Sequence, residues 1–407
     1  MFDVIVVGGG AAGMMAAGTA ASLYKKTLLI EKMQRTGRKI LVTGKGRCNV
    51  TNNCDVDTVL KNVVSNPKFL YSSVSLFSPN DTMAFFENLG VPLKTERGNR
   101  VFPVSDRSMD IADALIKNCH NNGVKVLNDT VTELVIENGE IAGVKTASGQ
   151  QISARSVIVA TGGLSYSKTG STGDGYKFAQ AAGHSITPLR ASLVGLKVKG
   201  NECKEMQGLS LKNTALSLRL KANDKLIFED MGEMLFTHFG VSGPIVLSAS
   251  AHVTDNPQNY YIELDLKPAL SFEKLDDRIS RDFNENLNKD FSNSLSKLLP
   301  KSLIDTVVKR SKIDADKKVN QITKAERASL CNAIKKLRFD ISGREDIETA
   351  IITAGGVVAR EIDPKTMQSK LVKGLYFAGE VIDVDACTGG FNLQIAFSTG
   401  YAAGINV

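Results

Sequence analysis

Several features that mark large protein classes are missing from this chain of 407 residues. No apolar run approaches the length of about 18 residues that a membrane-spanning helix needs, so no such helix is expected. The six cysteines include no C-x-x-C pair, which predicts reduced thiols in a cytoplasmic protein. The four histidines do not have metal-ligand spacing, so a metal site is not expected.

A strong charge of one sign is also missing. The net charge is +7, and the lysine-rich stretch 301–336 is interleaved with acids, which favours a solvated helical face over a nucleic-acid surface. The apolar N-terminus lacks a basic leader, so a signal peptide is not expected. With 43% hydrophobic and 23% charged residues, the composition is that of a globular protein of two or three domains.

The chain begins with a pattern typical of nucleotide binding. An apolar, β-branched run at 2–7 predicts a buried strand, and residues 11–23 predict a helix. Between them, Gly8, Gly10 and Gly13 have the G-x-G-x-x-G spacing. These glycines allow a tight turn, the approach of a pyrophosphate and close packing of helix on strand.

An acid closes the second predicted strand, 27–30. Glu31 lies near the roughly 20-residue offset at which a carboxylate meets a ribose hydroxyl. A carboxylate there disfavours a 2′-phosphate, so the sequence favours FAD or NAD over NADP. The alternative is a glycine-rich turn without any nucleotide, but strand, helix and acid together argue against it.

The next segment, 37–52, is too rich in glycine and cations for an ordinary crossover helix. Its cations, Arg38, Lys39, Lys45 and Arg47, are suited to offsetting the charge of a diphosphate. A solvated basic loop is the alternative interpretation.

The middle of the nucleotide-binding region changes to strand periodicity from Val124. Alternating apolar residues and glycine turns predict an antiparallel meander that returns to a buried strand at 156–160. Thr161, Gly162 and Gly163 would then lie at the carboxyl end of that strand, where open α/β sheets bind ligands. A second glycine turn follows, in which Asp174 caps the next helix or contacts a cofactor.

Residues 190–265 are predicted to be mainly β structure, with a turn at 237–250, and 271–337 to be amphipathic helices. The last segment returns to a strand ending at Glu380 and a glycine turn that opens a final helix. We therefore predict an α/β fold in which a discontinuous Rossmann-like domain carries an inserted β-barrel-like and helical part. The expected divisions are 1–189 and 346–407 for the nucleotide-binding domain, 190–270 with 335–345 for the β-rich insert, and 271–334 for the helical insert.

The whole chain resembles the BaiN/YhiN-like FAD-dependent oxidoreductases, also called aminoacetone oxidase family flavoproteins, of the two-dinucleotide-binding-domain superfamily. The specific motifs are RCNVTN at 47–52, FTHFGVSGP at 236–244 and TGGFNLQ at 388–394. Lys45 and Cys387 depart from the family pattern, where glycine and proline are frequent. The resemblance implies non-covalent FAD. From the resemblance and the glycine pattern, the expected cofactor-binding residues are Gly8, Gly10, Ala11, Ala12, Gly13, Glu31, Lys32, Arg38, Lys39, Asn49, Val131, Thr161, Gly162, Gly163, Gly379, Glu380, Asp383, Thr388, Gly389, Gly390, Asn392 and Leu393.

The expected activity is hydride transfer at the flavin to or from a small organic substrate. Because the chain has no second G-x-G-x-x-G, NADH or NADPH is expected only as a transient donor, for reduction of an activated C=C bond. Oxidation of an amine or alcohol by oxygen is the alternative, and a flavin-dependent RNA-modifying protein is a less favoured one. Spacing identifies no catalytic triad; the candidates for proton transfer or anion binding are Tyr166, His238, Arg47 and Asp385.

Overall fold

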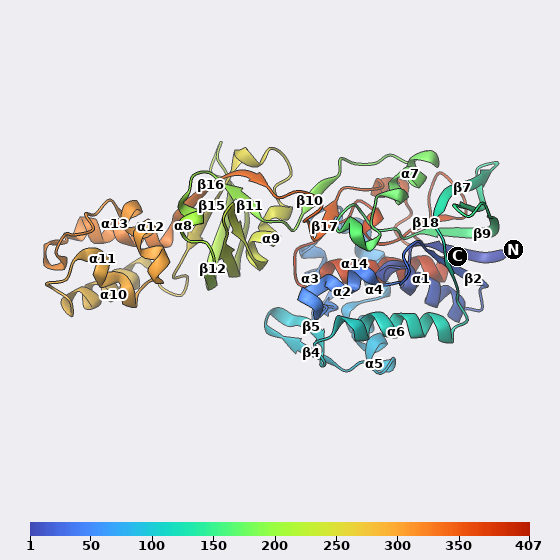
Figure 1. Cartoon of the computed structure of the whole chain (residues 1–407), viewed down its shortest axis with the longest axis horizontal. Helices are drawn as coiled ribbons and strands as arrows, with labels where there is room; N and C mark the ends of the chain where they lie inside the picture. Colours follow the sequence, from blue (N-terminus) through green and yellow to red (C-terminus); the bar gives the residue numbers. More distant parts are fainter. The chain divides into compact units, whose positions relative to one another are not determined.

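The computed structural model describes residues 1–407, and the chain divides into two compact units (Figure 1). The first unit combines Met1–Ser192 with Asp346–Val407, and the second is Leu193–Glu345. The expected fold class, a discontinuous α/β Rossmann-type domain with an inserted barrel and helices, is confirmed. None of the helices is long and apolar enough to cross a lipid bilayer.

The first unit is built on a seven-stranded sheet with the order β6-β2-β1-β9-β8-β7. The seventh strand, β18, pairs with the end of β9, beyond the residues that pair with β8. β1, β2, β6, β9 and β18 run parallel, whereas β7, β8 and β9 form an antiparallel meander. The strand from Lys125, predicted to begin the meander, instead extends the parallel part beside β2. The strands are β1 (Phe2–Val7), β2 (Thr27–Glu31), β6 (Lys125–Asn128), β7 (Val131–Glu137), β8 (Glu140–Thr146), β9 (Gln151–Val159) and β18 (Leu375–Phe377).

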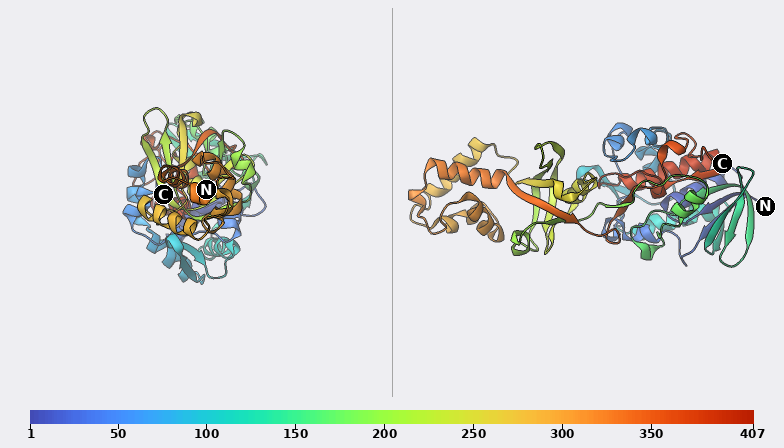
Figure 2. Two further views of the ribbon diagram at one scale, coloured as in Figure 1. Left: turned by 90° about the vertical axis from the view of Figure 1, so that its left-hand side faces the viewer. Right: turned by 90° about the horizontal axis from the view of Figure 1, so that it is seen from above.

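Helices from the two ends of the chain pack directly on each other in this unit. In α14 (Phe391–Asn406), a Cβ atom at Gly400 would lie 2.4 Å from the carbonyl oxygen of Ala12 in α1 (Ala11–Ser22). Such close contact between backbones requires glycine. Figure 2 shows the first and last segments, blue and red, together in this unit, so the carboxyl-terminal segment completes the fold that the amino-terminal segment begins.

The remaining elements of the first unit cover the sheet or form small ribbons. Residues 37–52, which were not expected to form an ordinary crossover helix, contain one helix of five residues, which Gly37 opens with a positive φ of 75° and which buries Ile40. The helices are α2 (Arg38–Val42), α3 (Val56–Lys61), α4 (Pro67–Leu76), α5 (Pro79–Asn88), α6 (Ser108–Asn121) and α7 (Asp174–Ala181), and the strands are β3 (Thr51–Asn52), β4 (Leu93–Glu96), β5 (Arg100–Pro103), β10 (Arg190–Ser192) and β17 (Ile352–Ala354).

The second unit is a closed barrel with helices inserted between its strands. The barrel order is β11-β14-β13-β12-β15-β16, from β11 (Leu196–Val198), β12 (Ser210–Leu220), β13 (Leu226–Phe236), β14 (Gly240–Ser242), β15 (Tyr260–Asp265) and β16 (Leu337–Arg344). The segment 237–250, predicted as one turn, contains β14 and the start of a helix, because Pro244 occupies the first helical turn. The helices are α8 (Glu202–Glu205), α9 (Pro244–Ala251), α10 (Phe272–Asn284), α11 (Phe291–Ser294), α12 (Lys301–Ser311) and α13 (Lys324–Lys335).

Short 3₁₀ segments complete both units. They are η1 (Thr43–Gly46), η2 (Arg97–Asn99), η3 (Ser167–Thr169), η4 (Pro257–Asn259), η5 (Leu295–Lys297), η6 (Val319–Gln321), η7 (Ala359–Glu361) and η8 (Gly379–Val381).

Candidate functional site

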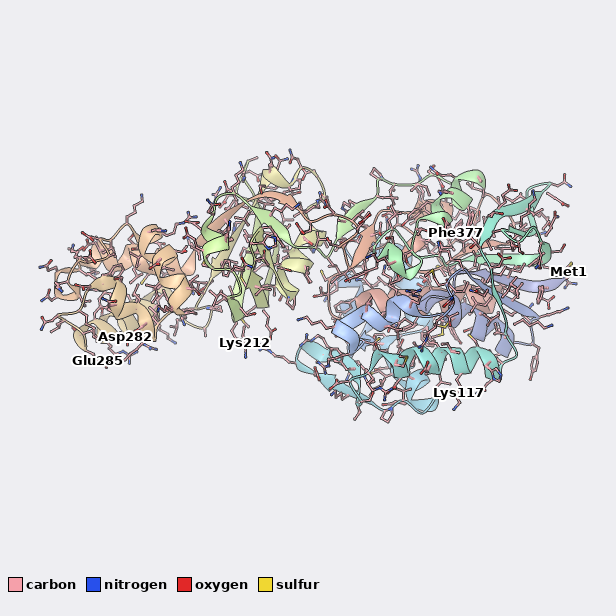
Figure 3. All side chains as sticks on the ribbon, in the orientation of Figure 1. Met1, Lys117, Lys212, Asp282, Glu285 and Phe377 are labelled. Carbon is pink, nitrogen blue, oxygen red and sulfur yellow. The ribbon has the colours of Figure 1, made fainter.

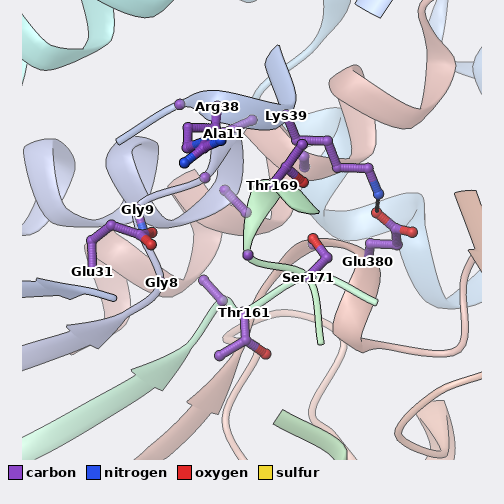
Figure 4. Close-up of a pocket in the computed structure, with 18 of the residues that line it drawn as sticks. Gly8, Gly9, Ala11, Glu31, Arg38, Lys39, Thr161, Thr169, Ser171 and Glu380 are labelled. Carbon is purple, nitrogen blue, oxygen red and sulfur yellow. Dashed lines mark hydrogen bonds and ion pairs between the residues drawn. The ribbon is translucent and has the colours of Figure 1, made fainter. Parts of the chain in front are cut away.

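A cavity of about 1330 Å³, including its open mouth, lies in the first unit (Figure 4). It opens where β1, β2 and β9 end and where α1 and α14 begin, which is the position of ligands in open α/β sheets. The polar and glycine residues that line it are Gly8, Gly9, Gly10, Glu31, Lys32, Arg35, Gly37, Arg38, Lys39, Thr43, Asp129, Thr130, Thr161, Gly162, Thr169, Gly170, Ser171, Asp174, Gly379, Glu380 and Asn392.

The three glycines of the first turn have different surroundings. A Cβ atom at Gly13 would lie 1.9 Å from the carbonyl oxygen of Gly8, and one at Gly8 would lie 2.6 Å from the oxygen of Ala160. A Cβ atom at Gly10 would meet no atom within 4 Å. Gly8 and Gly13 are therefore required by the fold itself, whereas Gly10 keeps free a space that the protein does not fill.

The start of α1 is suited to an anion. Gly10 caps the helix without a side-chain hydrogen bond, and no acid lies in the first turn. The amides of Ala11 and Ala12 thus remain without side-chain acceptors beside the cavity, where the helix dipole favours negative charge. Arg38 also lines the cavity, is exposed, and has no ion pair or hydrogen bond. This arrangement fits a diphosphate.

Glu31 closes the other end of the turn. One of its carboxylate oxygens accepts a hydrogen bond of 2.7 Å from the amide of Gly9, and the other accepts one of 2.7 Å from the amide of Met33. A carboxylate has about four acceptor positions, so both oxygens can still accept from a ribose hydroxyl. The carboxylate fits an adenosine with a free 2′-hydroxyl.

A charged network joins three distant segments at the cavity wall. The Nζ atom of Lys39 lies 2.6 Å from Oε2 of Glu380 (Figure 4). It also donates to Oγ of Ser165 at 2.7 Å. The other oxygen of Glu380 accepts from the hydroxyl of Ser165 and from the amide of Thr353. The ammonium and carboxylate therefore compensate each other and fix the relative positions of α2, the segment after β9, and η8.

A second ion pair connects two walls of the cavity. Nζ of Lys32 lies 2.6 Å from Oδ2 of Asp174 and also hydrogen-bonds to Thr172. Burial by itself would raise the pKa of Asp174, but the hydrogen bonds from Lys32 and Thr172 and the charge of Lys32 leave it below its ordinary value. The alternative that Asp174 caps α7 was wrong. The cap residue is Gly173, and no side chain forms a capping hydrogen bond at this helix start.

The cavity fits a flavin adenine dinucleotide on observations of its own residues. It combines the uncapped helix start, the free guanidinium of Arg38, the carboxylate of Glu31 and the unfilled space at Gly10.

Many of the expected cofactor residues meet at this cavity. Those that line it are Gly8, Gly10, Ala11, Ala12, Glu31, Lys32, Arg38, Lys39, Val131, Thr161, Gly162, Gly379, Glu380, Asn392 and Leu393. The structure does not place Gly13, Asn49, Gly163, Asp383, Thr388, Gly389 or Gly390 among the lining residues. Gly13 lies beneath Gly8, and Gly390 would contact the carbonyl of Thr51 if it had a Cβ atom, so both act through backbone packing.

The four catalytic candidates are not brought together at this cavity. Arg47 lies outside it, paired with Glu96 and Asp106 and placed over the ring of Phe102, and these acids raise its pKa. Tyr166 is half-buried, has a positive φ of 53°, and also lies outside the lining.

Asp385 is fully buried in the first unit, where Oδ2 accepts from the hydroxyl of Ser192 at 3.0 Å. Its neighbour Val384 lines the cavity, whereas Asp385 does not. Burial raises the pKa of Asp385, and Ser65, Arg190 and Ser192 oppose that rise. His238 is exposed in the second unit and meets the ring of Phe239 edge-on.

Sequence reasoning missed several lining residues. The glycine-rich turn before α7 contributes Thr169, Gly170 and Ser171 to the lining. For this turn the sequence left helix capping and cofactor contact as two open interpretations. Two further lining residues, Asp129 and Thr130, directly precede Val131. They follow the end of a strand that pairs with β2 at Glu31, and this position could have indicated them. Ile351 and Ile352 had no signal, because nothing in their apolar run indicates the strand pairing of β17 with β10 that places them at the cavity.

Comparison with known proteins finds a family and relatives that match the chain along nearly its whole length. The model of the family described as HI0933-like protein Rossmann domain matches residues 2–406. The chain is 31% identical to the 3-dehydro-bile acid delta(4,6)-reductase of Clostridium scindens, covering 98% of this chain and 97% of that protein. It is 30% identical to the ribosomal RNA dihydrouridine synthase of Escherichia coli, covering 98% and 96% of the two chains.

A solved structure shows the same fold. The 3-ketosteroid delta1-dehydrogenase of Sterolibacterium denitrificans aligns over 99% of this chain and 98% of that one, with a TM-score of 0.55 and 15% identity. The similarity of shape extends over both chains almost completely, although few residues are shared.

Proposed function

This chain belongs to the HI0933-like Rossmann family of flavin-dependent oxidoreductases, and we propose that it uses FAD to reduce a C=C bond conjugated to a carbonyl group. NADH or NADPH is the proposed electron donor. The cytoplasm is the proposed compartment, since both donors are available there.

The observation that supports the reaction class is the similarity along nearly the whole chain to two differently named reductive enzymes. A bile acid delta(4,6)-reductase saturates C=C bonds conjugated to a ketone. A dihydrouridine synthase saturates the C5=C6 bond of uracil, which is conjugated to the C4 carbonyl. In both cases the carbon of the C=C bond farther from the carbonyl receives a hydride and the nearer carbon a proton, so one flavin chemistry serves both substrates.

The residues of this chain have distinct parts in that proposal. The amides at the start of α1 and the guanidinium of Arg38 hold the diphosphate, and Glu31 holds the adenosine ribose. Glu380, oriented by Lys39 and Ser165, holds the polar chain between diphosphate and ring. When bound, FAD supplies the two-electron hydride transfer.

The substrate has two candidates of different size. A small enone is one, in accordance with the bile acid reductase. A uracil base in RNA is the other, and a specific observation favours it: two full-length relatives, from Escherichia coli and from Haemophilus influenzae at 31% identity, carry the name ribosomal RNA dihydrouridine synthase.

The first experiment is anaerobic mixing of the purified holoenzyme with NADH and, separately, with NADPH. Bleaching of the flavin band near ~450 nm by either donor supports a reductase. The reduced protein is then mixed with a 4-ene-3-ketosteroid and with a uridine-containing RNA, and reoxidation without oxygen identifies the acceptor. If neither donor bleaches the flavin but an amine or alcohol does, the proposal is wrong and the protein is an oxidase.

A further inference from the structure

The helical part of the second unit contains a hollow with an unusual charge arrangement. It has a volume of about 450 Å³ including its mouth, and it lies along α10 and the turn that precedes this helix. Its lining consists of Leu270, Lys274, Asp277, Arg278 and Arg281. Three of these five side chains are cations.

The amphipathic pattern of α10 gathers the cations. Leu275, Ile279 and Phe283 are buried in the core of the unit. Lys274 and Arg278 are four residues apart and Arg281 is three further on, so all three project from one side of the helix next to this apolar face. Packing of α10 therefore fixes the direction in which the cations point.

Several cations elsewhere on these helices are neutralised by acids. Arg327 pairs with Asp276 at 2.9 Å, and Lys317 pairs with Glu326 at 2.6 Å. Glu285, which Figure 3 labels with Asp282 near the end of α10, pairs with Lys297.

Two of the three cations in the hollow lack such a pair. Arg278 is held by Asp282 through both carboxylate oxygens, at 2.9 and 3.0 Å. Lys274 and Arg281 have no acidic partner, and Asp277 is the single unpaired acid among the lining residues. The lining therefore keeps a net positive charge that the protein does not neutralise.

The turn before α10 is held in place by hydrogen bonds from a lysine of α13. The Nζ atom of Lys335 donates to the carbonyl of Leu270 at 2.6 Å and to that of Lys267 at 3.2 Å, so the turn is fixed in place. A rigid turn and a packed helix thus hold an electropositive surface in one shape.

We propose that this hollow binds the phosphodiester backbone of an RNA substrate. The inference rests on the proposed function with RNA as the substrate. Lys274 and Arg281 are seven residues apart, a rise of about 10 Å along the helix, which exceeds a single phosphate and matches an extended polyanion.

The test measures binding of a fluorescently labelled oligouridine of about 20 nucleotides to the FAD-loaded protein by anisotropy, at several salt concentrations. The variant Lys274→Ala/Arg281→Ala is expected to bind about tenfold more weakly. Loss of two phosphate contacts on a single strand lowers the slope of log K against log salt by about 1.4. Unchanged affinity and slope would overturn the proposal.

A matched control removes the same charge outside the hollow. Lys301 and Lys324 are exposed, have no acidic partner, and occupy the first positions of α12 and α13, where a cation opposes the helix dipole. The variant Lys301→Ala/Lys324→Ala is expected to change affinity by less than about twofold, because these lysines lie outside the hollow. An equal loss in both variants would show nonspecific attraction and overturn the assignment.

Two further measurements distinguish RNA from other anionic ligands. Inorganic phosphate at 10 mM is expected to leave oligouridine binding nearly unchanged, and complete displacement would assign the hollow to a lone anion instead. Binding to phosphatidylglycerol vesicles that is lost in the hollow variant but not in the control would assign it to a lipid surface. Bleaching of the flavin by NADH or NADPH should be the same in both variants, so failure of the reductase proposal remains distinguishable from failure of this one.

Discussion

Lys32 and Asp174 form an ion pair of 2.6 Å that joins the end of β2 to the start of α7 across the nucleotide cavity. Less than a third of each side chain is exposed, 23% and 27%. Both residues line the cavity, so the pair connects the wall next to Glu31 with the glycine-rich turn 169–174. A dinucleotide that occupies the cavity would lie between these walls.

This pair should slow the release of FAD. Replacing Lys32→Met is expected to accelerate dissociation about fivefold, the equivalent of about 1 kcal/mol, because the turn loses its charged link to β2. The rate is measured from the rise of flavin fluorescence after large dilution into buffer without FAD. Combining it with Asp174→Asn should add little further. A matched control is Lys145→Met, which removes an exposed pair with Glu133 on β7 and β8 and should leave the rate unchanged.

Two glycine substitutions separate a cofactor role from a structural role. Gly13→Ala should destabilise the protein with or without FAD, since its Cβ atom would lie 1.9 Å from a carbonyl oxygen. Gly10→Ala should leave the thermal stability of the apoprotein within about 2 °C of wild type, because its Cβ atom meets nothing. It should nevertheless weaken FAD binding at least tenfold, since the methyl group enters the space for the diphosphate. If Gly10→Ala binds FAD as wild type does, the diphosphate is not at this turn.

The parts of the fold that the sequence predicted are those with strong local patterns. The strand, glycine turn and helix at 2–22 and the helix after Gly390 follow from periodicity and glycine spacing. The parallel pairing of Lys125–Asn128 with β2 was not predictable, because an edge strand and a meander strand show the same alternation. The short helix α2 was missed because it depends on the burial of Ile40 by distant segments.

In the candidate site, too, the sequence predicted what local spacing shows and not the contacts between distant segments. Glu31 and the glycines were found from spacing, but the pairing of Lys39 with Glu380 joins residues 341 positions apart. Arg47, expected beside the cofactor because of its charge, is instead held by Glu96 at the end of β4 and by Asp106 after β5. A cation in a basic loop has no local signal that tells which acid it will meet.

His184 should make stability depend on pH. Its Nε2 atom lies 2.7 Å from Oγ of Ser369, and that oxygen already accepts from the amides of Leu371 and Val372. The serine hydroxyl therefore donates to Nε2, and the proton of the neutral ring is on Nδ1, 3.3 Å from Glu361. Burial lowers the pKa of His184, although Glu361 opposes this.

Because the pKa of His184 is lower in the folded protein than in the unfolded chain, the unfolded chain binds the proton more tightly. The stabilising contribution of His184 is thus present above the unfolded pKa of about 6.5 and is lost as the pH falls through the lower folded value. Thermal unfolding between pH 8 and pH 5.5 should show a smaller decrease for His184→Gln than for wild type. His120→Gln, at an exposed position on α6, should keep the wild-type slope. Equal slopes for wild type and His184→Gln would contradict this assignment.

Asp385 should prove a structural acid and not a proton donor in turnover. It is fully buried, burial raises its pKa, and its Oδ1 atom has no hydrogen-bond partner. The contribution of a raised carboxyl pKa to stability is present below the unfolded value and is lost as the pH rises through the folded value. Asp385→Asn keeps an acceptor for Ser192 and removes the titration, so its stability relative to wild type should improve from pH 5 to pH 8, by about 2 °C in Tm.

The same variant decides the catalytic role. Since Val384 and not Asp385 faces the cavity, reduction of the flavin by NADH or NADPH and the subsequent reduction of the acceptor should both stay within about twofold of wild type. General acid catalysis contributes about 100-fold or more, so a loss of that size in acceptor reduction, with unchanged flavin bleaching, would identify Asp385 as the proton donor instead. Comparing the two half-reactions in one variant therefore separates proton delivery from cofactor binding, because damage to the FAD cavity would slow both.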